Sequence, residues 1–91
     1  MEYINETGRI YATDPTGKLL AEVTFPTKNG ISTINHTFVD SSLRGQGIAG
    51  ELVKLAADQI MAAGNHIKAT CPYAVTWFQH HPEYPVTTTR G

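Results

Sequence analysis

Residue types that bind anions or act as nucleophiles gather in two short segments of the 91-residue chain. The first segment is rich in glycine and contains Gly45, Gly47 and Gly50 directly after Arg44. The second contains Cys71, which is the only cysteine and precedes a proline. Backbone amides in a glycine turn that precedes a helix bind phosphate groups, and a helix N-terminus lowers the pKa of a thiol placed there. The two segments therefore predict an anion site and a reactive thiol.

The glycine turn allows other interpretations as well. The spacing of Gly45, Gly47 and Gly50 also matches the dinucleotide fingerprint. That interpretation is disfavoured because residues 68–71, about 20 positions further on, include no acid that could hold a ribose. A P-loop is excluded because no Gly-Lys-Ser or Gly-Lys-Thr occurs in the chain. A turn that needs glycine only for its backbone conformation is the remaining alternative.

Cys71 and the histidines are the candidates for catalysis. Cys71 could serve as a nucleophile or as a base, although a lone cysteine is commonly a small buried apolar residue. The alternation of Ile34, His36 and Phe38 predicts one shared strand face, so His36 is either a polar core residue or a site residue aimed at Cys71. His80 and His81 are adjacent and must diverge on a helix end, so no metal site is expected.

The elements that must position these groups follow from the apolar pattern and its turns. Asp14-Pro15-Thr16-Gly17 and Asn29-Gly30 are turn signals between segments with the two-residue period of strands. After residue 46 the apolar period becomes helical. The expected elements are strands at 9–13, 19–25 and 31–39, a weaker strand after residue 2, a helix at 47–63, a strand at 66–70 and a short helix at 73–80.

This order predicts an α+β fold with a mainly antiparallel sheet, a long helix after the glycine turn and a short C-terminal helix. Residues 1–91 are expected to form a single domain, because the chain is too short for two cores. Trp77, Phe78 and Tyr73 are expected to pack the short helix onto the sheet. The polar, threonine-rich segment 85–91 is expected to be a frayed tail.

Composition narrows the classes of partner. The chain has 41% hydrophobic residues, 16% charged residues and a net charge of −1, so no nucleic-acid partner is expected. No stretch is long and apolar enough to predict a membrane span. A single cysteine and an N-terminus without a signal-peptide pattern lead us to expect a cytoplasmic protein.

Four sequence elements, spread in order over residues 9–84, carry a family resemblance. Arg44, Gly47 and Ala49 resemble the acyl-CoA signature of the GNAT N-acyltransferase superfamily, in which Arg or Gln precedes x-x-Gly-x-Gly or Ala. A His-Thr-x-Val element at 36–39, a Cys-Pro element at 71–72 and a Phe-x-x-His-Pro-Glu-Tyr element at 78–84 are similar to those of a minimal, single-module branch of that superfamily.

The resemblance implies that acetyl-CoA is the cofactor. It places the pyrophosphate on the backbone amides of the glycine turn, with a cation at its mouth and the pantetheine arm along the preceding strand. The acyl group would then point into a gap between that strand and residues 66–70. The residues implied in cofactor binding are Phe38, Val39, Asp40, Arg44, Gly45, Gln46, Gly47, Ile48 and Ala49. One or two of Tyr73, Trp77 and Phe78 could also touch the pantetheine.

The resemblance also implies N-acetyl transfer to an amine, either a protein lysine or a small polyamine. The chain departs from the superfamily pattern, because 31–39 contains no carboxylate and Phe78 stands where a proton-donating Tyr is usual. Cys71 is therefore the candidate catalyst, and an acyl-CoA-binding sensor or interaction module without turnover is the alternative. The early helices of larger relatives are missing, which implies an open acceptor site or one completed by a partner or by self-association.

Overall fold

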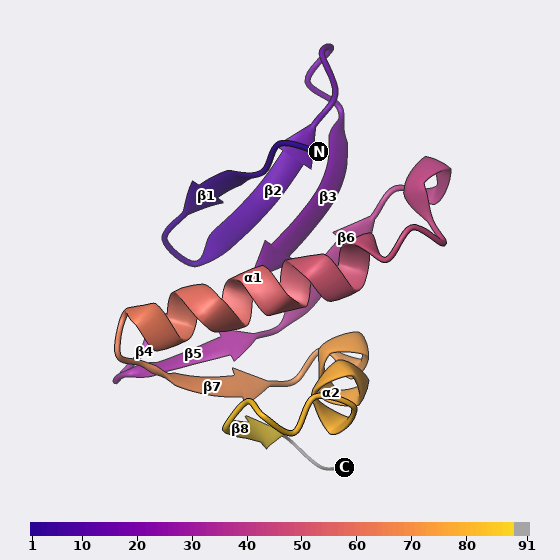
Figure 1. The fold of residues 1–91 in the computed structure, drawn as a ribbon. Helices are drawn as coiled ribbons and strands as arrows, with labels where there is room; N and C mark the ends of the chain where they lie inside the picture. Colours follow the sequence, from indigo (N-terminus) through magenta and orange to yellow (C-terminus); the bar gives the residue numbers. More distant parts are fainter. Residues whose placement is uncertain (89–91) are drawn as a thin grey trace.

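The chain forms two small four-stranded sheets with a long helix against them (Figure 1). The structure is a computed structural model and describes residues 1–88. It confirms the expected α+β fold with its long helix and short C-terminal helix. The elements are β1 (Ile4–Glu6), β2 (Arg9–Thr13), β3 (Leu19–Thr24), β4 (Thr27–Lys28), β5 (Ile31–Ile34), β6 (His36–Val39), the 3-10 helix η1 (Ser41–Leu43), α1 (Ile48–Ala62), β7 (His66–Ala69), α2 (Pro72–Gln79) and β8 (Val86–Thr88).

The first sheet is antiparallel throughout, in the order β1-β2-β3-β6. Its β2–β3 hairpin closes through the predicted turn, where the Asp14 carboxylate accepts hydrogen bonds from the amides of Thr16 and Lys18 at 2.9 and 3.0 Å. The Thr16 hydroxyl also donates to this carboxylate, at 2.6 Å. The hydroxyl bond contributes most, and together with the two amide bonds it holds the pKa of Asp14 below its usual value. Ala21 and Val23 are buried, as the alternation predicted.

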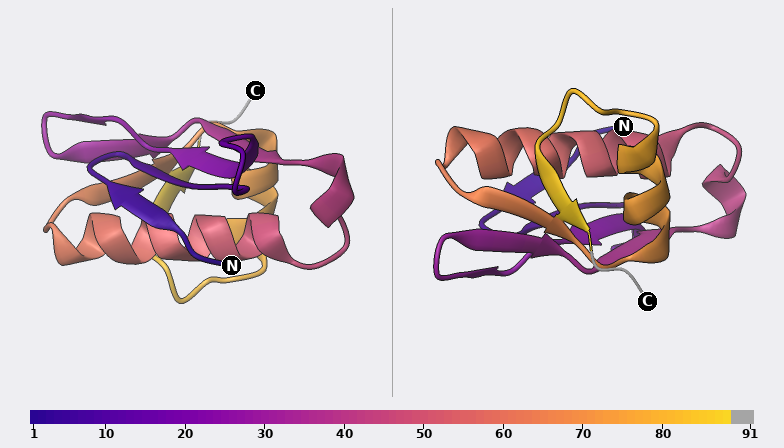
Figure 2. Two further views of the ribbon diagram at one scale, coloured as in Figure 1. Left: turned by 90° about the horizontal axis from the view of Figure 1, so that it is seen from above. Right: turned by 90° about the horizontal axis from the view of Figure 1, so that it is seen from below.

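The second sheet has the order β4-β5-β7-β8 and is mostly parallel. Strands β5 and β7 run parallel because α1 lies between them in the chain and supplies the crossover that parallel pairing needs. Figure 2 shows α1 running the length of the molecule, with η1 near one end and the connection to β7 at the other. The N-terminal end of α1 and the start of β7 are therefore separate regions of the molecule.

The predicted strand 31–39 is in fact two strands that belong to different sheets. The break lies at Asn35, whose amide donates to the Thr24 carbonyl at 3.2 Å and whose side-chain oxygen accepts from the Thr24 hydroxyl at 2.6 Å. One extra residue in an alternating strand moves every later side chain to the other face. Ile34 is buried whereas His36 and Phe38 are exposed, so the predicted shared face was wrong.

The predicted frayed tail is also partly wrong, because Val86–Thr88 forms a strand beside β7. The segment is fixed by Tyr84, whose hydroxyl donates to Asp58 on α1 at 2.9 Å and whose ring contacts Trp77 and Phe78. The short, polar segment gave no strand pattern of its own, and tertiary contacts supply the order. Residues 89–91 of the predicted tail lie outside the described residues.

The long helix agrees with the predicted range 47–63 to within one residue at each end, and it supplies much of the core. Its apolar face is buried against both sheets, and the chain leaves the helix through Gly64, whose φ of 78° is left-handed. In residues 1–88, no helix has both the length and the apolar character that crossing a membrane requires. The buried residues of α1 are Ile48, Leu52, Val53, Ala56, Ala57 and Ile60.

Candidate active site

The glycine turn presents open backbone amides at the start of α1. Gly45 and Gly47 have φ angles of 85° and 74°, and no atom lies within 4 Å of a Cβ built on either residue. These positions therefore favour glycine because of their left-handed backbone and not because of crowding. Gly47 is the N-cap of α1 and has no side chain with which to cap the first-turn amides. Those amides and the positive end of the helix dipole face outward, which is the arrangement that binds anions.

A cavity of about 220 Å³ opens directly beside this turn. Its lining includes most of the residues that the sequence assigned to cofactor binding, and it adds Leu43 and Tyr73. Tyr73 was expected to pack the short helix onto the sheet but is 42% exposed. The sequence allowed Tyr73 a contact with the pantetheine but did not place it at the glycine turn, because it lies more than 20 residues beyond the turn and reaches the cavity only through the packing of α2. The complete lining is Val39, Leu43, Arg44, Gly45, Gly47, Ile48, Ala49 and Tyr73.

Three of the predicted cofactor residues do not line this cavity. Phe38 lies on the opposite strand face from Val39 and is 37% exposed. The Asp40 carboxylate caps η1 by accepting from the Ser42 amide at 3.1 Å, and the bond from the Ser42 hydroxyl keeps the pKa of Asp40 below its usual value. Gln46 is exposed within the turn. Any role of these three side chains in cofactor binding remains a prediction.

Cys71 lies at the N-cap of α2 and is buried, with 8% exposure. Its Sγ is 3.4 Å from the Thr37 hydroxyl of β6. Burial acts to raise the pKa of the thiol, but the Thr37 hydroxyl and the nearby amides of Ala74 and Tyr73 act against burial. The net effect is a pKa below the ordinary value. The structure therefore surrounds this sulfur with the donors that favour a thiolate.

The second sheet and β6 part next to Cys71. Strand β5 pairs with β7 as far as Ile34 and Ala69, and then the Ile34 carbonyl accepts from the amides of Thr70 and Cys71 at 3.1 and 3.2 Å. Beyond that point the chain continues as β6, which pairs with β3 in the first sheet. Among residues 1–88, β6 has no strand partner on its other side. An open strand edge therefore leads from the sulfur toward the glycine turn.

The structure does not bring His36 to Cys71. Thr37 contacts the sulfur, and adjacent residues of a strand face opposite ways. The His36 side chain is 53% exposed, which contradicts the core interpretation, and its Nε2 lies 3.5 Å from Glu22. The Glu22 carboxylate also accepts from Arg9 at 2.6 Å. His36 and Glu22 thus form a polar cluster on the sheet face away from the thiol.

Gly50 lies at the close approach of the two helices. A Cβ at this position would lie 3.0 Å from Trp77 Nε1 and 3.2 Å from Tyr73 Oη. The third glycine of the literal dinucleotide pattern therefore brings α2 close to α1 and does not serve a phosphate. Its placement sets where the N-terminus of α2, and so Cys71, lies relative to the glycine turn.

The adjacent histidines have separate local roles. Nδ1 of His80 lies 3.0 Å from the Thr76 carbonyl, and Nδ1 of His81 lies 2.7 Å from the Trp77 carbonyl. The His81 ring also stacks on Trp77, with 3.7 Å between centroids. Within the described part of the chain, no three His, Cys, Asp or Glu side chains are grouped so that they could hold a metal ion.

Comparison with known proteins identifies a family and several solved structures with a similar fold. The family profile described as GCN5-related N-acetyl-transferase matches residues 9–87. A GCN5-like N-acetyltransferase candidate from Staphylococcus aureus, solved by NMR, is 25% identical with a TM-score of 0.77, covering 98% of this chain and 90% of that one. No curated protein sequence matches significantly.

Two larger enzymes share the fold over part of their length. A ribosomal-protein alanine N-acetyltransferase from Escherichia coli is 18% identical with a TM-score of 0.62, and the match covers 87% of this chain and 51% of that enzyme. One from Brucella melitensis is 17% identical with a TM-score of 0.50, covering 90% and 50%. The family profile spans most of this chain and includes both the glycine turn and Cys71, so the protein belongs to the GCN5-related N-acetyltransferase family.

Proposed function

We propose that this protein binds acetyl-CoA at the glycine turn and transfers its acetyl group to an amine. The observation that carries the proposal is the cavity beside the open amides of α1, joined by the free edge of β6 to a buried thiol of lowered pKa. Family membership supports N-acetyl transfer as the general activity. The cofactor, the acceptor and the role of the thiol are the proposed parts.

In this proposal the two ends of acetyl-CoA use different features. The amides of residues 45–49 and the guanidinium of Arg44 hold the pyrophosphate. Arg44 suits that role because no carboxylate lies within 4.0 Å of it among residues 1–88. The pantetheine amides pair with the free edge of β6, so Phe38 and Asp40 contribute backbone groups. Tyr73 closes the cavity wall opposite the turn.

Cys71 carries the acetyl group from CoA to the amine in two steps. Its thiolate attacks the thioester carbonyl, so a new bond forms from Sγ to the acetyl carbon, the bond to the CoA sulfur breaks, and CoA leaves as a thiolate that takes a proton from water. A neutral acceptor amine then attacks the acetyl-cysteine carbonyl, so a bond forms from nitrogen to the acetyl carbon and the bond to Sγ breaks. Cys71 leaves as a thiolate, and the amine proton passes to the hydroxide that the first step left in the solvent. Thr37 is a positioning residue, because it acts by stabilising that thiolate.

The alternative function is binding of acyl-CoA without turnover. The observation that favours it is the placement of Glu22, the carboxylate paired across from Phe38, on the sheet face away from Cys71. Glu22 is therefore not placed to assist deprotonation of an amine at the sulfur. Release of CoA that depends on an added amine, such as spermidine or a lysine peptide, separates the two functions.

Native mass spectrometry after incubation with acetyl-CoA tests the proposal. We expect a noncovalent adduct and a covalent acetyl group that peptide mapping assigns to Cys71, with CoA released when an amine is added. The Cys71→Ser variant is the matched control and should keep the noncovalent adduct only. A noncovalent adduct without CoA release would establish the binding module, and no adduct at all would refute both functions.

A further inference from the structure

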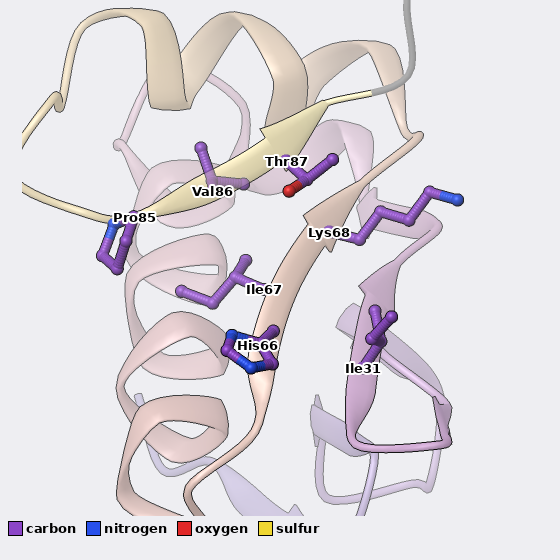
Figure 3. Close-up of a pocket in the computed structure, with 7 residues that line it drawn as sticks. All are labelled: Ile31, His66, Ile67, Lys68, Pro85, Val86 and Thr87. Atoms are coloured by element: carbon purple, nitrogen blue, oxygen red, sulfur yellow. The ribbon is translucent and has the colours of Figure 1, made fainter.

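The outer face of the second sheet is hollowed and basic. It has a cavity of about 510 Å³ at the β7–β8 end and one of about 240 Å³ at the β4–β5 end, and the two share Ile31 and Lys68 (Figure 3). In Figure 3 the Lys68 side chain extends from β7 toward β5, and Ile31 lies further along β5, level with His66. We name this surface the basic sheet face and define it by Lys28, Ile31, Thr33, His66, Lys68 and Thr87.

The strand register places these side chains on one side of the sheet. Lys28 pairs with Ile31, and Ile31 pairs with His66. The alternate residues Ile67 and Ala69 are buried, so the basic sheet face is the side turned away from the core. None of its residues lines the cavity at the glycine turn, so this surface does not depend on the proposed function.

Among residues 1–88, two lysines of this face lack a carboxylate partner, as does Arg44 at the glycine turn. Arg9, Lys18 and Lys54 each lie within 4.0 Å of a carboxylate. In the described range 1–88, Lys28 and Lys68 have no such partner, and neither cavity is lined by an acid. A chain with a net charge of −1 therefore keeps two unpaired ammonium groups beside one hollow. Charge complementarity points to a ligand that carries carboxylates.

The apolar part of the surface favours a peptide over a small anion. Ile31 is 42% exposed, and Pro85 lines the larger cavity, so a ligand must also cover apolar surface. Neither cavity is lined by a Phe, Tyr or Trp ring on which a nucleic-acid base could stack.

We propose that the basic sheet face binds an extended acidic peptide segment of a partner protein. Carboxylates of that segment meet Lys28 and Lys68, which lie two strands apart in the sheet order, or about 10 Å across the sheet. An apolar side chain between the carboxylates covers Ile31.

Titration of the 15N-labelled protein with the peptide acetyl-Glu-Glu-Ile-Glu-Glu-amide tests this proposal by NMR. We expect shifts confined to amides of β4, β5, β7 and β8, and weaker binding as salt is added. The K28Q/K68Q variant should bind about tenfold more weakly, whereas K54Q, which removes an ion-paired lysine of α1, should bind as the wild type does.

Other ligands in the same experiment can overturn the proposal. Absence of peptide shifts, or equal binding of acetyl-Lys-Lys-Ile-Lys-Lys-amide, would refute it. Equal shifts with inorganic phosphate would reduce the surface to a simple anion site, and tighter binding of oligo-uridine would assign it to nucleic acid instead. Acetyl-CoA, titrated separately, should shift residues 44–49, so failure of either site is distinguishable from failure of the other.

Discussion

The two helix N-termini of this protein handle negative charge in opposite ways. At α1 the N-cap is Gly47, and the first residues of the helix line the cavity beside the glycine turn. At α2 the N-cap is Cys71, whose buried sulfur lies 3.4 Å from the Thr37 hydroxyl, and the nearby amides of Tyr73 and Ala74 help to lower the pKa of the thiol. The same backbone feature thus offers an anion site to a ligand in one helix and stabilises an anion of the protein itself in the other.

This comparison separates binding from chemistry. A phosphate needs exposed donors without side chains in the way, which glycine provides. A thiolate nucleophile needs donors fixed at its own sulfur and partial shielding from water, which a buried N-cap provides. Gly50 connects the two, because it allows α2 to approach the first turn of α1. Each contribution can be removed separately.

The largest effect is expected from Gly47→Val. A branched side chain at a φ of 74° strains the turn and covers the amides that would hold the pyrophosphate, so acetyl-CoA affinity should fall about 100-fold or more by calorimetry. Gly17→Val is the matched control, because Gly17 has a φ of 91° and equally open surroundings but lies in the Asp14 turn. Unchanged affinity in Gly47→Val would refute the anion site at α1.

The next effect is expected from Cys71→Ala. Removing the sulfur should abolish amine-dependent release of CoA while acetyl-CoA affinity stays within about threefold of the wild type, since the α1 turn is untouched. Steady-state kinetics and calorimetry on the same preparation check both parts. Full turnover in this variant would refute the role of Cys71 as nucleophile and would indicate direct transfer from acetyl-CoA to the amine.

A smaller effect is expected from Thr37→Val, which removes one donor from the sulfur. The pKa of Cys71 should rise, so the pH at which alkylation by iodoacetamide reaches half its plateau should move upward. Below that pH the variant should react several-fold more slowly than the wild type. Thr13→Val, an exposed substitution on β2, should leave the profile in place. A shift in the opposite direction would contradict the assigned role of Thr37.

The smallest effect is expected from Gly50→Ala. The added methyl meets the ends of the Tyr73 and Trp77 side chains at 3.2 and 3.0 Å, while alanine improves helix propensity by up to about 1 kcal/mol. We expect little change in the midpoint of urea unfolding but a few-fold change in the alkylation rate of Cys71 as α2 shifts. No change in that rate would show that the two N-termini are independent.

Much of the fold could be predicted because it depends on the local spacing of apolar residues and on turn residues. The helical spacing from Ile48 to Ile60 and the turn at Asp14 require no knowledge of distant residues. Family motifs likewise located the glycine turn. The break between β5 and β6 at Asn35 could not be predicted in this way, because it depends on the hydrogen bonds that Asn35 makes with Thr24 on another strand.

The sequence by itself determined the element order, the glycine turn and the single thiol at a helix start, since these depend on the conformational preferences of neighbouring residues. Tertiary structure decided which groups meet: Thr37 and not His36 at Cys71, Tyr73 at the cavity, and β8 beside β7. The physical reason is that side-chain contacts across the chain depend on strand register and helix packing. One added residue or one missing Cβ can change either of these without altering the local pattern.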